Sequence, residues 1–354
     1  MKEFGSDFHR YDLDFCVANS QLKKFRCLRF YASGRHAIEA IIKQEKWKRI
    51  WMPAYFCYEV IEYIKSKEID VILYNDYPLC ENDDEVVRQI PYKEDDVLFR
   101  TDYFGLRKWR TNKGIPVPVI EDHTHGLTTD WAIRSNADWC IASLRKSLPI
   151  ATGGVLWSPK SKRIPLDLKP TDDCEAIARM RYNAMDLKAN YLKANYASER
   201  EDSAVKNVFR KDFIDSEQQI DKMKISGIDA KSKQIVNSMN IEELTCSKFE
   251  NWKIATNLLG DRFNIIGYDR IDNWNPFSLI LLLNSTDERN ALLQYMVKQK
   301  IYPAILWRIP ENSEFKEAHD FSDKMLSVHC DNRYNCEEIT DMCNKIIGFY
   351  DTNI

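Results

Sequence analysis

The chain has 354 residues and a formal net charge of −3 at pH 7, with 44% hydrophobic and 30% charged residues. These values are ordinary for a globular protein with a sizeable core. They give no electrostatic signal for nucleic acid or an anionic membrane, and the most apolar run, 279–283, is too short to cross a bilayer. The start is polar without an apolar signal segment, and the ten cysteines form no Cys-x-x-Cys pair. We therefore expect a cytoplasmic protein with reduced thiols.

The first half of the chain alternates between short apolar runs and helical patterns. Apolar residues at helical spacing from Ala37 to Ile42 predict a helix that begins beside Ser33-Gly34. Apolar runs of strand length lie at 50–52, 71–74, 97–99, 117–120, 140–142 and 155–157. This pattern predicts an α/β fold with a mostly parallel central sheet and helices on both faces.

The second half changes in character. Residues 172–234 contain many helix formers and few strand signals, which predicts long helices. A helix to Leu259, a strand at 278–283 and a helix introduced by the capping pattern Ser285-x-x-Glu288 follow. We expect a large domain over 1–245 and a small C-terminal α/β domain over 246–354.

Three chemically distinctive side chains follow two of the predicted strands. Asp122 closes one apolar strand, Ser143 closes the next, and Lys146 stands three residues further on. In open α/β sheets, ligands bind beyond the carboxyl ends of the strands. A lysine, a hydroxyl and an aspartate are what pyridoxal 5'-phosphate (PLP) requires: the lysine forms a Schiff base, the hydroxyl holds the phosphate and the aspartate keeps the pyridine nitrogen protonated.

Simpler interpretations compete with these assignments. Lys146 also fits a solvated loop lysine, although the apolar residues Leu144, Leu148 and Ile150 around it predict burial, which lowers a lysine's pKa. Asp122 also fits a helix N-cap, or a metal site formed with His123 and His125. The other histidines belong to no motif that would complete such a site, so we predict no metal.

Further residues are candidates for the same site. Backbone N–H groups after Ser33-Gly34, with the charge of Arg35, suit a phosphate. Tyr55 and Phe56 follow a strand that stops at Pro53, and either ring fits stacking on a flat cofactor or ordinary core packing. Trp307 and Arg308 fit the cleft between the domains, although Arg308 also fits a surface cation.

The chain resembles the nucleotide-sugar aminotransferases of PLP fold type I, the DegT/StrS type. The residues that carry the likeness are Ser33-Gly34, Pro53 with the following aromatics, Phe104-Gly105, Glu121-Asp122 with His125, Ser143 with Lys146, and Thr152-Gly153-Gly154. In the C-terminal part, Asn251 to Leu259, Ile301 to Trp307 and Leu326 to Tyr334 are similar to the family's later segments.

The resemblance implies a role for each matched residue. Lys146 would bond to the cofactor, Asp122 would face the pyridinium nitrogen, and His125 would hydrogen-bond the phenolic oxygen. Ser143, with the backbone at Arg35 and His36, would bind the phosphate. The family also implies a homodimer with a shared active site, and transfer of an amino group from glutamate or glutamine to a keto-sugar nucleotide.

The chain departs from the family in its phosphate segment. Arg35 and His36 replace a threonine and an alanine, and two residues rather than four separate Ser143 from Lys146. We predict a PLP-dependent aminotransferase that acts on small molecules, with Trp307 and Arg308 near the substrate. The alternatives are a PLP- or sugar-binding homologue without transaminase activity, and a metal-dependent hydrolase.

Overall fold

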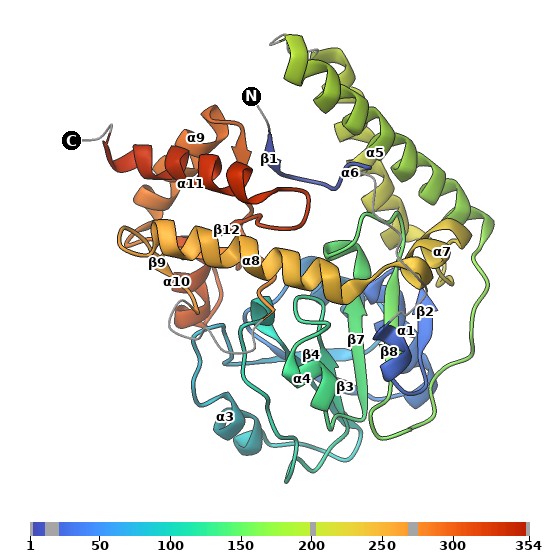
Figure 1. Cartoon of the computed structure of the whole chain (residues 1–354). Helices are drawn as coiled ribbons and strands as arrows, with labels where there is room; N and C mark the ends of the chain where they lie inside the picture. The colour runs from blue at the N-terminus through green and yellow to red at the C-terminus, as the bar shows by residue number, and fades with distance from the viewer. Residues whose placement is uncertain (1–2, 11–20, 199–202, 268–274, 352–354) are drawn as a thin grey trace.

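The computed structural model describes residues 3–10, 21–198, 203–267 and 275–351 (Figure 1). Seven strands form the central sheet in the order β2-β8-β7-β6-β5-β3-β4. Their bounds are β2 (Arg29–Tyr31), β3 (Arg49–Pro53), β4 (Asp70–Tyr74), β5 (Asp96–Thr101), β6 (Val119–Asp122), β7 (Trp139–Ser143) and β8 (Gly154–Trp157). β8 runs antiparallel to both of its neighbours, and the other strand pairs are parallel. The predicted mostly parallel sheet is confirmed.

Both faces of this sheet are buried, which explains why its strands are continuously apolar. On β5, Val97 and Phe99 belong to the core that includes α1 (Gly34–Glu45), while Leu98 belongs to the core on the opposite face. Side chains alternate between the two faces of a strand, so a strand covered on both sides needs apolar residues at every position. The short helices of this half are α2 (Tyr58–Lys65), α3 (Asp83–Gln89) and α4 (Asp130–Arg134), with one-turn 3₁₀ helices η1 (Gln21–Lys24), η2 (Tyr103–Gly105) and η3 (Leu144–Lys146).

Three helices occupy the stretch that the sequence predicts to be helical. They are α5 (Asp172–Ser198), α6 (Ser203–Lys222) and α7 (Ala230–Ser238). Figure 1 shows α5 and α6 side by side, reaching away from the central sheet. Buried aromatic residues, including Tyr191, Phe209 and Phe213, pack between these two helices.

The C-terminal part has its own sheet and core. Its elements are α8 (Ile241–Leu259), β9 (Asn264–Ile265), β10 (Leu279–Leu282), α9 (Thr286–Lys298), β11 (Ile301–Tyr302), α10 (Lys316–Lys324), β12 (Met325–Val328) and α11 (Cys336–Asp351). The strands β12-β10-β9 form an antiparallel sheet. The Ser285 hydroxyl accepts a hydrogen bond from the Glu288 backbone at 3.1 Å, as the capping pattern predicts.

The N-terminal segment joins this C-terminal part. β1 (Phe4–Gly5) pairs in parallel with β11, and the Gly5 N–H donates to the Tyr334 hydroxyl at 2.7 Å. The sequence did not predict this pairing, because two-residue strands carry no periodicity. In the described parts of the chain, no helix is long and apolar enough to span a membrane.

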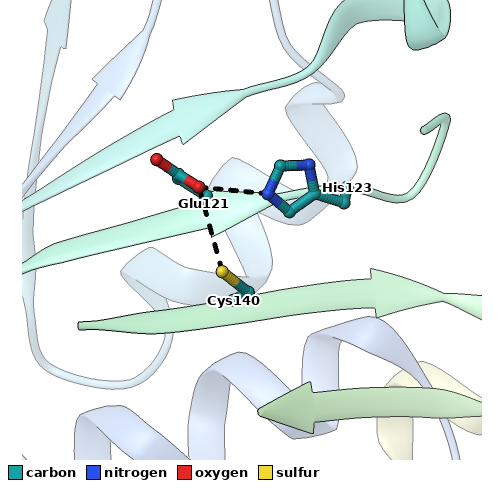
Figure 2. A group of neighbouring side chains, drawn as sticks. All are labelled: Glu121, His123 and Cys140. Atoms are coloured by element: carbon teal, nitrogen blue, oxygen red, sulfur yellow. Dashed lines mark hydrogen bonds and ion pairs between the residues drawn. The ribbon is translucent and has the colours of Figure 1, made fainter. Parts of the chain in front are cut away.

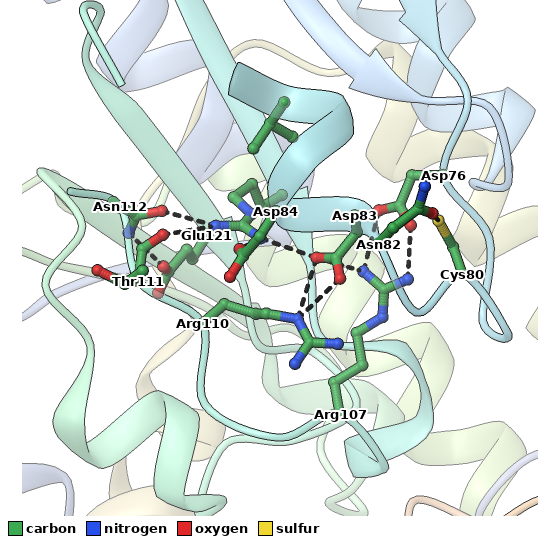
Figure 3. A network of polar contacts seen from close by, with 12 residues as sticks. Asp76, Cys80, Asn82, Asp83, Asp84, Arg107, Arg110, Thr111, Asn112 and Glu121 are labelled. Carbon is green, nitrogen blue, oxygen red and sulfur yellow. Dashed lines mark hydrogen bonds and ion pairs between the residues drawn. The ribbon is translucent and has the colours of Figure 1, made fainter. Parts of the chain in front are cut away.

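A buried network of charged residues includes Arg100 of β5 and stabilises this part of the central sheet (Figure 3). Arg100 donates to Asp83 at 2.8 Å and to Asp84 at 2.6 Å, and Arg107 donates to Asp76 at 2.5 Å. Arg100 and Asp83 are each 1% exposed, so each charge depends on its partners for the solvation that it lost on folding.

We predict that Arg100→Met destabilises the protein by about 3–5 kcal/mol, because it leaves the buried Asp83 charge with fewer partners. The midpoint of urea unfolding would measure the loss. Arg88→Met is the matched control: Arg88 lies 3.9 Å from Asp84 with 44% of its side chain exposed, and an exposed pair contributes about 1 kcal/mol or less. Equal effects of the two substitutions would contradict the role given to the network.

Candidate active site

A cavity of about 590 Å³ lies where the carboxyl ends of β5, β6 and β7 meet α1. The predicted site residues that line it are Ser33, Gly34, Arg35, Phe56, Asp122, His125, Ser143, Lys146, Trp307 and Arg308. These residues come from segments up to 275 positions apart (308 − 33), so the fold brings most of the predicted set to one place.

Lys146 stands at the edge of this cavity. It ends η3, directly after β7, and it also lines a smaller neighbouring cavity of about 50 Å³. Its neighbours Leu144, Leu148 and Ile150 are buried, but Lys146 itself is exposed, so the predicted burial of this lysine is wrong. The apolar neighbours occupy the core side of the turn, which leaves the lysine on the cavity side.

The first turn of α1 lies against β7 and β8 because two glycines permit the contact. A Cβ on Gly34 would lie 3.3 Å from the Ser143 Cβ, and a Cβ on Gly154 would lie 2.1 Å from the Ser33 carbonyl oxygen. Within the described chain, the N–H groups of Gly34 and Arg35 have no hydrogen-bond partner. Free N–H groups at a helix start attract anions, so this turn and Ser143 form a place for a phosphate.

His36 and Tyr55 do not line the cavity. The Ser33 hydroxyl caps the His36 N–H at 3.2 Å, so the backbone of His36 is not free for a phosphate as the resemblance implied. Burial lowers the pKa of the His36 ring to about 4. Tyr55 is fully buried and packs edge-on against Tyr103 at 5.5 Å, which is the core-packing alternative. Phe56 does line the cavity.

Asp122 is the last residue of β6 and its side chain is almost fully buried. Its Oδ1 atom accepts from the Thr124 N–H at 2.8 Å and from the Thr124 hydroxyl at 2.5 Å. Burial raises the pKa of Asp122 to about 6, against the effect of these hydrogen bonds, and nearby Asp102 raises it further. The next helix, α4, is capped by Thr129, so Asp122 is not a helix N-cap. A buried carboxylate facing a cavity is suited to a cationic ligand atom.

The three residues of the predicted metal alternative do not converge. Glu121 and His123 point away from Asp122, because neighbouring residues of a strand face opposite sides, and they contact each other at 3.1 Å (Figure 2). His125 stacks on aromatic rings instead. Among the described residues, the group of three close potential ligands is Glu121, His123 and Cys140, all buried. Glu121 already accepts from Ser135 at 2.6 Å, so this group forms a hydrogen-bonded charge cluster.

Asp102 is a second carboxylate of the cavity that sequence reasoning missed. Its Oδ2 atom accepts from the Thr129 hydroxyl at 2.8 Å and lies 3.6 Å from Nδ1 of His123. Its Oδ1 atom is buried and has no hydrogen-bond partner among the described residues. Although burial acts against it, contacts with Asp102, Cys140 and Glu121 raise the pKa of His123 well above its ordinary value. Asp102 directly follows β5, so the strand-end rule that found Asp122 also applies to it.

His125 forms part of an aromatic stack beside the cavity. Its ring lies 4.1 Å from that of Phe277 and 5.3 Å from that of Trp307, and both pairs are nearly parallel. Burial, with the charges of Lys146 and Lys248, lowers the pKa of His125 to about 3, so its ring is neutral. A neutral imidazole offers one donor and one acceptor nitrogen.

Among the comparisons with known proteins, the one with solved structures identifies the fold. Neither the protein-family models nor the curated proteins give a match. A solved structure described as a sugar aminotransferase of Streptococcus pneumoniae, in its PLP form, is 14% identical, with a TM-score of 0.63 over 95% of this chain and 90% of that chain. The PseC aminotransferase of Helicobacter pylori, involved in pseudoaminic acid biosynthesis, is 11% identical, with a TM-score of 0.61 over 99% and 100%.

A third structure, a DegT/DnrJ/EryC1/StrS aminotransferase of Brucella abortus, is 11% identical, with a TM-score of 0.59 over 92% of this chain and 86% of that chain. This chain therefore has the fold of these PLP-dependent aminotransferases.

We predict that Asp122→Asn stabilises the cofactor-free protein above about pH 6. A folded-state pKa raised from 3.8 to about 6 means that the folded protein holds this proton more tightly, so stability falls as pH rises through that interval. At about 1.4 kcal/mol per pKa unit, the gain at pH 8 is on the order of 2–3 kcal/mol, and it vanishes below about pH 4. Urea unfolding of both proteins across this pH range measures it. A variant less stable than the parent at pH 8 would contradict the prediction.

Proposed function

We propose that this protein is a PLP-dependent aminotransferase. The observation that carries the proposal is one cavity that joins Lys146, Asp122 and the free N–H groups at the start of α1, beside Ser143. These are the groups that PLP needs for its aldehyde, its pyridine nitrogen and its phosphate. The fold shared with solved aminotransferases supports the same conclusion.

The residues of the cavity fit the cofactor at each end. The N–H groups of Gly34 and Arg35, with the Ser143 hydroxyl, would hold the phosphate. Asp122 would face the pyridine nitrogen, and burial, which raises its pKa, would favour pairing of this carboxylate with a cationic ring nitrogen. His125, kept neutral by burial, would hydrogen-bond the phenolic oxygen.

When bound, PLP supplies an electron sink for the transfer of an amino group. Lys146 would hold the cofactor at its Nζ atom and then move a proton as general acid and base. Asp122 would keep a proton on the pyridine nitrogen by electrostatic stabilisation, and Asp102 adds a second negative charge nearby. Phe56 lines the same cavity, where an aromatic face excludes water from a bound ring.

We propose a keto-sugar nucleotide as the amino acceptor and glutamate or glutamine as the donor. The proteins from S. pneumoniae and H. pylori are named for sugar or pseudoaminic acid chemistry. Trp307 and Arg308 line the cavity, where an aromatic ring suits a sugar or base and a guanidinium suits a phosphate.

We further propose a cytoplasmic homodimer with the active site at the subunit interface. Exposed apolar side chains on α5 and α6, namely Leu187, Val208 and Ile214, are suited to a protein contact. We keep the two-domain organisation, 1–245 and 246–354, as part of the proposal; the boundary between residues 245 and 246 falls inside α8.

The second candidate is a PLP- or sugar-binding homologue without transaminase activity. The observation that favours it is Arg35, whose guanidinium pairs with Asp221 and Glu59, so it does not serve the cofactor's phosphate. The metal-dependent hydrolase is not favoured by any such observation, since Asp122, His123 and His125 face different surroundings.

We predict that borohydride reduction of the PLP-loaded protein fixes a phosphopyridoxyl group on Lys146, because Lys146 is the lysine that lines the cavity beside Asp122 and Ser143. Peptide mass mapping locates the group. Lys146→Ala should lose the label and at least about 10³-fold in activity, as expected when a covalent catalyst is removed. Lys248→Ala, which changes a lysine of the smaller cavity, is the control and should keep the label. Labelling at another lysine would reject the assignment.

Half-reactions separate the acceptor classes and the two candidate functions. Protein loaded with glutamate to the pyridoxamine form should return to the PLP spectrum when a keto-sugar nucleotide is added, because the cavity offers Trp307 and Arg308 to such a substrate. Return with 2-oxo acids alone would exclude the sugar acceptor while keeping the aminotransferase. If bound PLP never changes form, the homologue without transaminase activity is the better description.

A further inference from the structure

Three buried arginines line the same cavity as the proposed cofactor site. Arg35 belongs to the first turn of α1, Arg145 to η3 and Arg181 to α5, and the side chains are 10%, 7% and 10% exposed. Buried arginines need anionic partners, because each loses its hydration on folding.

A single carboxylate on α6, that of Glu217, contacts all three guanidinium groups. Arg145 donates to both oxygens of Glu217, at 2.7 and 3.0 Å, and Arg181 donates to one of them at 3.3 Å. Arg35 lies 3.7 Å from Glu217 and also contacts Asp221. Burial acts to raise the pKa of Glu217, but Arg145 and Arg181 hold it well below its ordinary value, so Glu217 is ionised.

The carboxylates around the three guanidiniums are more exposed than the guanidiniums themselves. Three guanidiniums face Glu217 and Asp221, each about one-third exposed, while Glu59 on Arg35 is 78% exposed and Asp7 on Arg181 is 46% exposed. Burial and, to a smaller extent, the neighbouring Arg145 lower the pKa of Arg181.

The carboxylates of the cluster do not use every donor of the three guanidiniums. The Nε–H groups of Arg35, Arg145 and Arg181 are buried and have no hydrogen-bond partner within the described chain. Since a carboxylate has two oxygens and a phosphoryl group presents three, a phosphoryl group can accept from guanidiniums that Glu217 leaves unsatisfied.

We propose that Arg35, Arg145 and Arg181 form a second anion site for a phosphoryl group of the substrate, beside the cofactor's phosphate, and that Glu217 occupies it until the substrate binds. The proposal rests on the proposed function in placing the cofactor at the α1 amides. The phosphoryl group displaces the Glu217 carboxylate from the guanidiniums and takes its hydrogen bonds. Glu217 is thus an internal competitor that pairs with the arginines until the substrate binds.

The test is calorimetric titration of the PLP-loaded protein with inorganic phosphate, pyrophosphate and UDP at constant ionic strength. Glu217→Gln removes the competing charge and should bind pyrophosphate about tenfold more tightly, while Arg181→Gln should bind it about tenfold more weakly. Asp215→Asn is the control, because Asp215 pairs with Lys211 on α6 and does not line the cavity. Thermal melting checks that each variant folds. If Glu217→Gln does not fold, the pyrophosphate affinity of Arg181→Gln tests the proposal by itself.

Similar affinities in the parent, Glu217→Gln and Arg181→Gln would overturn the proposal. So would pyrophosphate binding that PLP abolishes, since the arginines would then serve the cofactor's own phosphate. Tighter binding of UDP than of pyrophosphate, with the same changes in the variants, supports the site and identifies a nucleotide as the source. Equal binding supports the site and identifies a simple phosphoryl compound. If the protein binds pyrophosphate in this pattern but never takes up PLP, the anion site stands and the proposed aminotransferase function fails.

Discussion

The alternation of side chains along β6 is the constraint on which the rest of the site depends. Asp122 faces the cavity, whereas Glu121 and His123 face the opposite side. Successive residues of a strand point to opposite faces. One short segment therefore supplies the carboxylate that faces the cavity and, on the other face, a pair of buried polar side chains that contact each other. The Asn112 amide group donates to Glu121 at 2.6 Å and accepts from Arg100 at 3.1 Å. These hydrogen bonds connect Glu121 to the buried charged network around Arg100.

The two sides of the cavity carry different charged groups. On the side of β5 and β6, Asp102 and Asp122 lie close together, and the imidazolium of His123 offsets part of their negative charge. On the side of α5 and α6, arginines gather around Glu217. The cationic ring nitrogen of the proposed cofactor suits the first side, and the phosphoryl group of the proposed substrate suits the second.

The C-terminal part of the chain supplies the aromatic rings that pack on His125 beside the cavity. Phe277 and Trp307 both stack on the His125 ring, so the neutral state of that histidine depends on packing between distant segments. The N-terminal segment contributes as well: Asp7 lines the larger cavity and Phe8 the smaller one, while β1 pairs with β11. The N-terminal segment and the C-terminal part thus both contribute residues to a site that also contains strand ends of the central sheet.

Much of the fold follows from patterns that are local in the sequence. The apolar runs predicted the sheet, because strands covered on both faces must be apolar throughout, and the Ser285 pattern predicted the start of α9. The strand-end rule placed Asp122, Ser143 and Lys146 together, since parallel strands bring their carboxyl ends to one edge.

Only the tertiary structure decided what depends on contacts between distant segments. It placed Tyr55 in the core and used the His36 N–H for the Ser33 cap, whereas the sequence made both candidates for the cofactor. It left Lys146 exposed because its apolar neighbours took the core side of η3. It also gathered Arg181 and Glu217 beside Arg145. No local spacing marks such a cluster, because its members come from separate elements that meet only when the chain has folded.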